Sequence, residues 1–256
     1  MIPAMSKFSR MTDVLDLYSE AHTLLTAEDI AERLNVSRPT AFRYARELSR
    51  TGFLANYSGR YGLGARIITL DYRIRESDPV LKTARDIMKA LTAETGCDAI
   101  LCRMYNEEII NVHHEKGYHA SGVTFGRGRP LPLFHGSASK VMLAFLPPAR
   151  LKKIFDKHRE TPELRELAPD WPSFKAYFAH IRQQGHYVSD QEVDKGTVGI
   201  AAPIAVPGIG TVAVISLTLS VERRALINTE GLAAIVKLRA NEVAQKLHHL
   251  ANDETR

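Results

Sequence analysis

The sequence predicts an α+β protein in two parts: a small helical module closed by a β-hairpin, and a larger domain built on a sheet. Three observations support this fold class. Short amphipathic helices follow one another before residue 52, a hairpin pattern occupies 53–63, and strand patterns alternate with helices from residue 98 onward. We place the first module at residues 6–66, a linker helix at 67–78 and the larger domain at 79–252.

The composition is that of an ordinary protein with a buried core. Of 256 residues, 45% are hydrophobic and 25% are charged. No apolar run approaches the roughly 20 residues of a membrane span, and the first ten residues lack a signal peptide, so we expect a cytoplasmic protein with no membrane partner. Cys97 and Cys102 are too few for a disulfide framework or a four-ligand zinc site, and we expect them to be reduced thiols.

Three helical patterns open the chain. The first two place apolar residues at i, i+3, i+4 and i+7: Met11, Val14, Leu15 and Tyr18, then Ala27, Ile30, Ala31 and Leu34. Thr26 and Asp29 form a capping-box pattern ahead of the second helix. After a tight turn, Ser37 is the expected N-cap of the third helix, and Gly52 is its expected stop. This succession is typical of a helix-turn-helix.

The third helix has an apolar face and a basic face. Its inner face is predicted to hold Ala41, Tyr44, Ala45 and Leu48, and the opposite face holds Arg43, Arg46 and Arg50. From Ser37 to Arg66 the chain carries six arginines and one glutamate, and this net charge of +5 equals that of the whole chain. Arginine suits bidentate recognition of phosphates and guanine edges, so the concentration indicates nucleic-acid binding.

A hairpin after the third helix is the expected wing of a winged helix-turn-helix. Residues 53–57 and 60–63 predict two strands joined by the turn Ser58-Gly59. We therefore predict that the module binds double-stranded operator DNA, with Arg46 and Arg60 on backbone phosphates. The residues expected to read the major groove are Ser37, Arg38, Thr40, Arg43 and Tyr44.

The rest of the chain predicts an α+β sheet domain. Residues 65–75 form a helical pattern, and Pro79 opens a longer helix that Gly96 closes. The segment 126–133 is too rich in glycine and proline to be regular. Strands are expected at 98–105, 109–115, 121–125, 200–206 and 211–219, with helices at 137–146, before Gly185 and at the carboxyl end.

With these elements in place, the sequence resembles the IclR family of bacterial regulators, named after the isocitrate-lyase repressor. Beside the winged module, three signatures carry the resemblance: Arg129–Leu133 with Ser139-Lys140, Ser189–Glu192 with Gly199–Ile204, and Gly210–Leu217. The resemblance implies a GAF-like α/β effector domain joined to the DNA-binding module by a linker helix. It also implies homodimers that pair into tetramers, and a pocket for a small organic acid or aromatic catabolite.

Family pocket positions map onto residues in several segments of this chain. Together with neighbouring candidates from the sequence, the predicted effector-binding set is Val123, Phe125, Leu131, Ser137, Ala138, Ser139, Ser189, Gly199, Ser216 and Thr218. The chain departs from the family pattern where a frequent Asp is Ser189, where a frequent Cys is Gly199, and at Phe134-His135. The serine and threonine hydroxyls and the start of the helix at Ser137 are suited to holding an organic anion. Arg127 and Arg129 are further candidates to clamp a carboxylate.

The sequence leaves other classes of function open. His113-His114 suggest a metal, but neighbouring residues of a strand point to opposite faces, so we predict neither a metal nor a cofactor. A metabolic enzyme that acts on a small organic acid, with the basic module used for docking, is the main alternative. Asp190 and Glu192 are its candidate acid and base, but no nucleophile motif is present and we assign no catalytic residue. A DNA-architectural protein would have a filled second domain, whereas a regulator should show a cavity in the low hundreds of Å³.

Overall fold

The chain in the computed structural model divides into two compact units, residues 1–77 and 78–256. The structure describes residues 7–119 and 126–253. The first unit contains, in chain order, α1 (Lys7–Thr12), the 3₁₀ turn η1 (Leu15–Leu17), β1 (Leu25–Thr26), α2 (Ala27–Leu34), α3 (Arg38–Arg50), β2 (Leu54–Tyr57), β3 (Arg60–Leu63) and α4 (Ala65–Ser77).

The first unit is a winged helix-turn-helix, as the sequence predicts. The capping box is formed, because the Thr26 hydroxyl accepts from the Asp29 N–H and the Asp29 carboxylate accepts from the Thr26 N–H. The hairpin pairs Tyr57 with Arg60 across its two-residue turn. One strand was missed by the sequence reasoning: β1 pairs antiparallel with β3 and gives the sheet order β1-β3-β2.

The first apolar stripe does not form one helix, and that prediction was wrong. α1 ends at Thr12, whose hydroxyl donates to the Ser9 carbonyl, a local bond that competes with helix propagation. Tyr18 is extended, and its hydroxyl donates to the Tyr61 carbonyl at 2.9 Å. Val14 is nevertheless fully buried in the core of this unit, so the stripe identified core residues but not their backbone conformation.

The second unit is a sheet with helices on both faces. Its elements are α5 (Pro79–Thr95), β4 (Asp98–Tyr105), β5 (Glu108–Glu115), β6 (Pro130–Leu131), α6 (Ser137–Ala144), α7 (Pro148–His158), α8 (Pro162–Leu167), α9 (Trp171–Gln184), β7 (Tyr187–Asp190), β8 (Thr197–Val206), β9 (Gly210–Ser220), α10 (Val221–Arg224) and α11 (Thr229–Asp253). The six strands are antiparallel in the order β6-β5-β4-β9-β8-β7.

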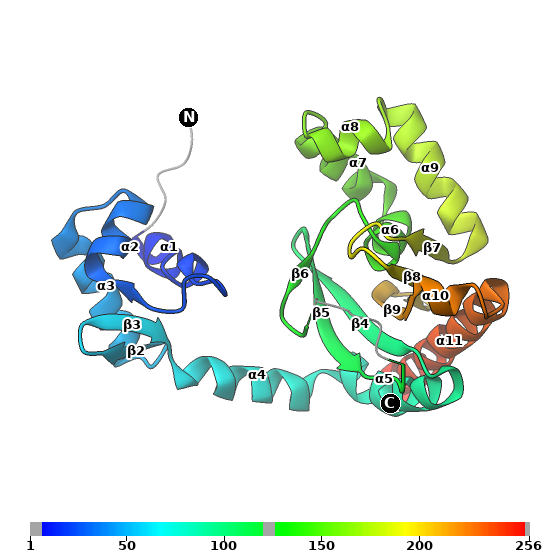
Figure 1. The fold of residues 1–256 in the computed structure, drawn as a ribbon, viewed down its shortest axis with the longest axis horizontal. Helices are drawn as coiled ribbons and strands as arrows, with labels where there is room; N and C mark the ends of the chain where they lie inside the picture. Colours follow the sequence, from blue (N-terminus) through cyan, green and yellow to red (C-terminus); the bar gives the residue numbers. More distant parts are fainter. Residues whose placement is uncertain (1–6, 120–125, 254–256) are drawn as a thin grey trace. The chain divides into compact units, whose positions relative to one another are not determined.

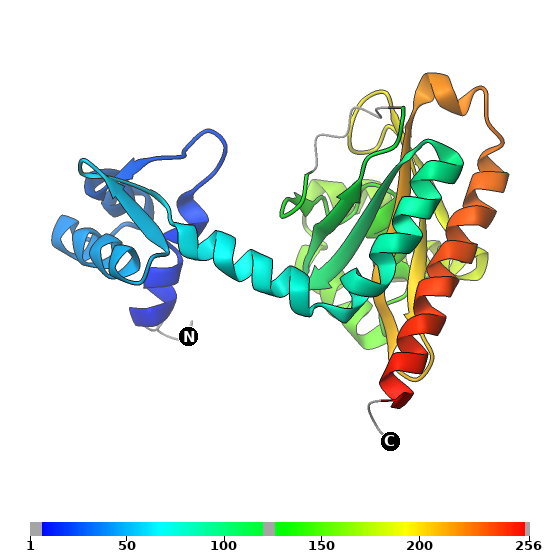
Figure 2. The ribbon, with the colours of Figure 1, turned by 90° about the horizontal axis from the view of Figure 1, so that it is seen from below.

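The alternation of side chains along the strands creates two cores. Ala99 and Leu101 of β4 belong to the core under α5 and α11, whereas Ile100 and Cys102 belong to the core under α6 to α9. Figures 1 and 2 show α5 and α11 on one face of the sheet and α6 and α9 on the other. Any ligand pocket between the sheet and α6 therefore draws its residues from every second strand position.

Several elements of this unit differ from the prediction. The segment 126–133 is not wholly irregular: β6 pairs with Ile109 and Ile110 at the sheet edge, where proline costs no ladder bond. α7, α8 and β7 were not predicted. The strand expected at 121–125 lies outside the described residues. Of the helices in the described part of the chain, none is both long and apolar enough to cross a bilayer.

Candidate nucleic-acid interface and ligand pocket

α3 is built to present one face to solvent. Ser37 is its N-cap and Pro39 occupies its first turn. The Ser37 hydroxyl makes no cap bond and instead lies 2.9 Å from the Thr40 hydroxyl. The residues predicted for the inner face, Ala41, Tyr44, Ala45 and Leu48, are all buried. The positions between them point outward, so the helix fixes its basic face by packing the opposite one.

The structure divides the six arginines between Ser37 and Arg66 into those without an ion-pair partner and those that are engaged. Arg43, Arg46 and Arg60 are exposed, and they make no ion pair with any residue that the structure describes. Two others are engaged: the Arg38 guanidinium pairs with Glu28, and Arg50 with Glu47 at 3.0 Å. Arg66 donates to the Thr51 carbonyl and lies over the Phe53 ring. The first group therefore has its donors available to an external anion such as a phosphate.

Tyr44 does not belong to the exposed face. Its side chain is 6% exposed and packs in the core of the first unit. The Arg43 guanidinium lies 5.8 Å from the centroid of its ring, so Tyr44 helps to support that arginine from below. Placing Tyr44 at the major groove was wrong, because its position in the helix is that of the buried stripe.

The wing turn has the geometry that its sequence requires. Ser58 and Gly59 both have positive φ, 53° and 88°, as a two-residue hairpin turn demands. The Asn56 side chain accepts a hydrogen bond from the Gly59 N–H at 2.9 Å and braces the turn. Arg60 begins the returning strand directly after this turn and is exposed.

Phe42 is an exposed residue of α3 that the sequence reasoning missed. Its side chain is 51% exposed, between Arg38 and Arg46 along the helix. A helical-wheel reading could have found it, because position 42 falls outside the buried stripe formed by residues 41, 44, 45 and 48.

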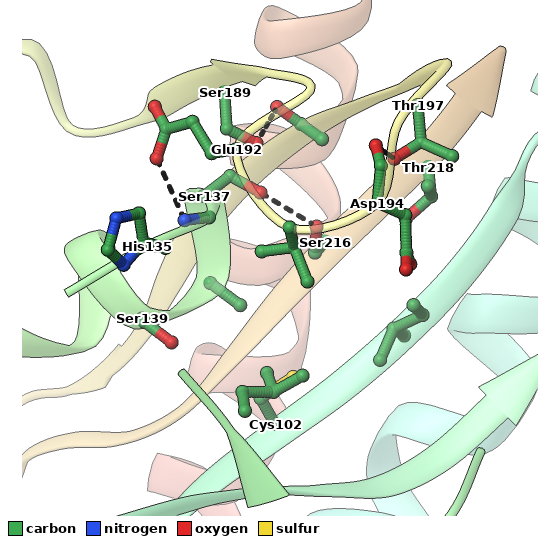
Figure 3. A pocket seen from close by; sticks show the side chains of 16 residues that line it. Cys102, His135, Ser137, Ser139, Ser189, Glu192, Asp194, Thr197, Ser216 and Thr218 are labelled. Carbon is green, nitrogen blue, oxygen red and sulfur yellow. Dashed lines mark hydrogen bonds between the residues drawn. The ribbon is translucent and has the colours of Figure 1, made fainter. Parts of the chain in front are cut away.

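A pocket of about 70 Å³ lies between α6, the strands and the β7–β8 loop (Figure 3). It is smaller than the low hundreds of Å³ expected for a regulator. Eight of the predicted effector residues line it: Leu131, Ser137, Ala138, Ser139, Ser189, Gly199, Ser216 and Thr218. The other two, Val123 and Phe125, lie outside the described residues, and Arg127 and Arg129 are not among the residues that line this pocket. Lining residues that the sequence reasoning missed include Ile100, Cys102, His135 and Thr197.

The pocket wall carries a row of hydroxyls. Ser216 and Thr218 alternate with the buried Ile215, Leu217 and Leu219 along β9, so that only the hydroxyl residues face α6. The Ser137 and Ser216 hydroxyls are 3.2 Å apart, and Figure 3 marks the hydrogen bond between them. These side chains are short, so a ligand can exchange the bond between them for bonds to itself.

Gly199 makes the close approach of α6 possible. A Cβ atom at this position would lie 2.5 Å from the Ser137 hydroxyl and 2.8 Å from the Ser189 hydroxyl. The Ser189 hydroxyl donates only a long bond, 3.5 Å, to the Gly199 carbonyl. The absent side chain therefore leaves room for two serine hydroxyls, and a larger residue would displace at least one of them.

The start of α6 is held by an acidic side chain from the neighbouring loop. Gly136 has φ 83° at the N-cap, and its N–H donates to the Glu192 carboxylate at 2.8 Å. The same carboxylate pairs with the Lys140 ammonium at 2.7 Å and accepts from the Tyr187 hydroxyl at 2.8 Å. Lys140 lies within cation–π distance of the Tyr187 and Tyr177 rings, 4.8 and 5.5 Å from their centroids. Glu192 thus neutralises a buried lysine and fixes the pocket rim.

The remaining polar candidates are occupied structurally. His113 pairs with Glu115 at 2.8 Å, whereas His114 faces Asp98 at 3.7 Å, so the two neighbouring rings serve different carboxylates. Asp190 forms an ion pair with Arg224. Asp190 is therefore engaged elsewhere, and it does not form an acid–base pair with Glu192.

Known proteins resemble this chain in both of its units. Residues 9–56 match the IclR helix-turn-helix domain model, and residues 74–245 match the model of the bacterial transcriptional regulator IclR C-terminal domain. The regulator XynR of Escherichia coli is 23% identical over 206 residues, which cover 79% of this chain and 81% of that protein. A glycerol operon regulatory protein of Streptomyces coelicolor is 26% identical, covering 84% of each chain.

Solved structures show the same fold. The crystal structure of an IclR homologue from Microbacterium hydrocarbonoxydans complexed with 4-hydroxybenzoate aligns with a TM-score of 0.76 at 20% identity, covering 95% of this chain and all of that one (100%). An IclR-type regulator from Alicyclobacillus acidocaldarius gives 0.76 at 22% identity, covering 93% and 97%.

Proposed function

The chain belongs to the IclR family of bacterial transcriptional regulators, and from this premise we propose that it binds a pseudo-palindromic operator and releases or holds it in response to a small organic molecule. The observation that supports operator binding is the exposed group Arg43, Arg46 and Arg60, which lie on α3 and on the wing that follows it. In a helix-turn-helix motif the second of the two helices enters the major groove, and in this chain that helix is α3. We assign Arg43 to base reading, and Arg46 and Arg60 to phosphates.

Three further polar residues belong to the proposed interface. Ser37 and Thr40 are in the first turn of α3, where a recognition helix meets bases and phosphates. Arg38 joins them, although DNA has to compete with Glu28 for its guanidinium. The DNA partner also implies a cytoplasmic location, because bacterial DNA lies there.

Fluorescence anisotropy with labelled duplex DNA tests operator binding. Arg46→Ala should reduce the slope of log affinity against log salt by about 0.9 for each phosphate that the arginine neutralises. Arg50→Ala is the matched control on the same helix, because Glu47 already pairs with that arginine; its effect on the slope should be smaller. Equal affinity of the wild-type protein for its own promoter and for random DNA would refute specific regulation.

The pocket supports an effector with a carboxylate. Glu192 already accepts from the Gly136 N–H at the N-cap, but the next N–H groups of α6 have no helical partners, and the helix dipole favours an anion there. Serine and threonine hydroxyls surround that position. Some relatives are named for aromatic acids, among them a p-hydroxybenzoate hydroxylase activator of Acinetobacter baylyi, 23% identical over 200 residues. Of the two predicted ligand classes, the cavity of about 70 Å³ favours a short organic acid, because an aromatic ring needs the rim to move outward.

Thermal-shift measurements on the full chain separate these classes. Glycolate and pyruvate form one set of probes, benzoate and 4-hydroxybenzoate the other, and uncharged amides of the same acids are the controls. A ligand at one hundred times its Kd stabilises the folded state by about 2.7 kcal/mol, so even a weak effector raises Tm at millimolar concentration. Equal shifts with acids and amides would contradict a carboxylate site.

A dimer completes the proposal. α4 buries none of its residues, all of which the structure describes, and it exposes Ile68, Tyr72 and Ile74 at 72%, 58% and 53%. Such an apolar surface favours contact with a second copy, as a two-fold operator requires. Light scattering of the wild type should give a dimer or a tetramer, and Ile68→Glu should reduce the mass and weaken operator binding. A monomeric wild type would contradict this part of the proposal.

A metabolic enzyme is the weaker candidate. In the pocket the Ser137 hydroxyl meets the Ser216 hydroxyl rather than a base, and Glu192 is committed to Lys140. Turnover of any acid that shifts Tm, followed by chromatography, would favour this alternative.

A further inference from the structure

An exposed aromatic ring stands among the arginines of α3. Phe42 is 51% exposed, whereas the other large apolar side chains of the helix, Tyr44 and Leu48, are 6% and 3% exposed. Phe42 is not part of the core cluster of this unit. The fold therefore gains little from a phenyl ring at this position.

The ring lies in the middle of the face assigned to DNA. Arg38 is one turn before Phe42 and Arg46 one turn after it, so the three share a row along the helix. On the wing side, Phe42 borders an open hollow of about 410 Å³, together with Pro39 and Gly59. The ring thus has free space in front of it and cations on either side.

The chemistry of the major groove supplies one apolar partner for such a ring. Each base pair presents hydrogen-bond donors and acceptors there, and only thymine adds a methyl group. We infer that Phe42 contacts the 5-methyl group of a thymine in the operator and so determines specificity at that base pair. This inference rests on the proposed entry of α3 into the major groove.

The inference separates Phe42 from its arginine neighbours. Arg46 and Arg60, assigned to phosphates, act through charge, so their removal changes affinity for all DNA and its dependence on salt. Phe42 carries no charge. Phe42→Ala should therefore leave the salt dependence of binding to random DNA unchanged, while it alters the preference for one base pair.

The test begins with selection of binding sites from a random duplex library by the full-length wild-type protein. In the selected sequence, each thymine of one half-site is then replaced singly by deoxyuridine, which lacks only the 5-methyl group. At one position the wild type should bind about fourfold more weakly, the effect of one methyl-sized apolar contact. With Phe42→Ala the same replacement should have no effect, and Phe42→Leu should retain most of it.

Tyr57→Ala is the matched control, because Tyr57 is an aromatic residue of the same unit with a similar exposed fraction, 57%. It should leave the methyl effect at that thymine unchanged. Unchanged melting curves for each variant show that the unit is folded. If no thymine shows a methyl effect, or if the effect persists in Phe42→Ala, the inference fails while the proposed function stands. If selection yields no sequence at all, both fail.

Discussion

Replacing Glu192 with Gln should destabilise the second unit strongly, although the change keeps the size of the side chain. The carboxylate accepts from three donors: the Gly136 N–H, the Tyr187 hydroxyl and the Lys140 ammonium. The Lys140 side chain is only 8% exposed. The amide oxygen can still accept hydrogen bonds, but the amide carries no charge, so it leaves the ammonium buried without a counter-charge.

The magnitude follows from this burial. Removing one partner of a buried ion pair costs about 3–5 kcal/mol. The Tyr187 and Tyr177 rings near the ammonium retain some stabilisation, about 0.5–2 kcal/mol. We therefore expect Glu192→Gln to lower the free energy of unfolding by about 3 kcal/mol, which for a domain of this size lowers Tm by roughly 6–12 °C.

Two further variants separate charge from packing. Lys140→Met removes the buried cation, while Glu192 is 19% exposed and keeps two hydrogen-bond donors. This variant should therefore lower the free energy of unfolding by only about 1–2 kcal/mol. The double variant Lys140→Met/Glu192→Gln has no buried charge at this position and should be more stable than Glu192→Gln alone. The cycle isolates the interaction of the pair, because the two side chains are in direct contact.

Urea unfolding at pH 7, followed by tryptophan fluorescence, measures these values. Trp171 is the single tryptophan of the chain, and it packs against Phe155 and Phe174 in the same unit. Its signal therefore reports on the unit that contains the pair. A decrease below 1 kcal/mol in Glu192→Gln, or a double variant as unstable as the sum of the singles, would show that Lys140 does not need this carboxylate.

Three other experiments test separate features of the structure. Gly199→Ala should weaken binding of the acid found by thermal shift about tenfold, as expected when one or two hydrogen bonds are removed, because its Cβ displaces serine hydroxyls; isothermal calorimetry measures this. The backbone N–H of Thr26 holds the pKa of Asp29 below its usual value, so this carboxylate stabilises the first unit above about pH 4, and its contribution fades as pH falls through the folded-state pKa. An acid titration followed by circular dichroism checks this, and Asp29→Asn should lack that component. Burial raises the pKa of Cys102 to about 12 and also raises that of Cys97, so a disulfide reagent at pH 8 should label neither thiol before unfolding.

Local patterns predicted most of the fold because local chemistry decides it. The capping box at Thr26, the wing turn at Ser58-Gly59 and the helix start at Pro79 each depend on residues a few positions apart. Short elements without such signals were missed. β7 has four residues, and β6 has two that include a proline, so neither shows an alternation long enough to detect.

The pocket was predicted by resemblance more than by pattern. Periodicity alone does not bring Ser137 to Ser216, 79 positions away; the family resemblance assigned both to one pocket, and the structure shows their contact. The bond between Lys140 and Glu192 was not foreseen, because nothing in either segment specifies a partner on the other. Long-range polar contacts depend on the register of the sheet and on the placing of α6 over it.

The net charge of the DNA-binding face also depends on a long-range contact that the sequence does not predict. Counting from Ser37 to Arg66 gives +5, but Glu28 lies outside that window and the fold brings it to Arg38. Exposed pairs of this kind are weak, about 0–1 kcal/mol, so a phosphate can displace Glu28 at little cost. Arg38 therefore contributes less than Arg43 or Arg46 to the electrostatic attraction of free DNA. Its own contribution increases once a close contact has formed and a phosphate has displaced Glu28. Removing Glu28 leaves the Arg38 charge unpaired in the free protein. It should therefore strengthen non-specific binding to DNA more than specific binding, because non-specific binding depends on charge alone.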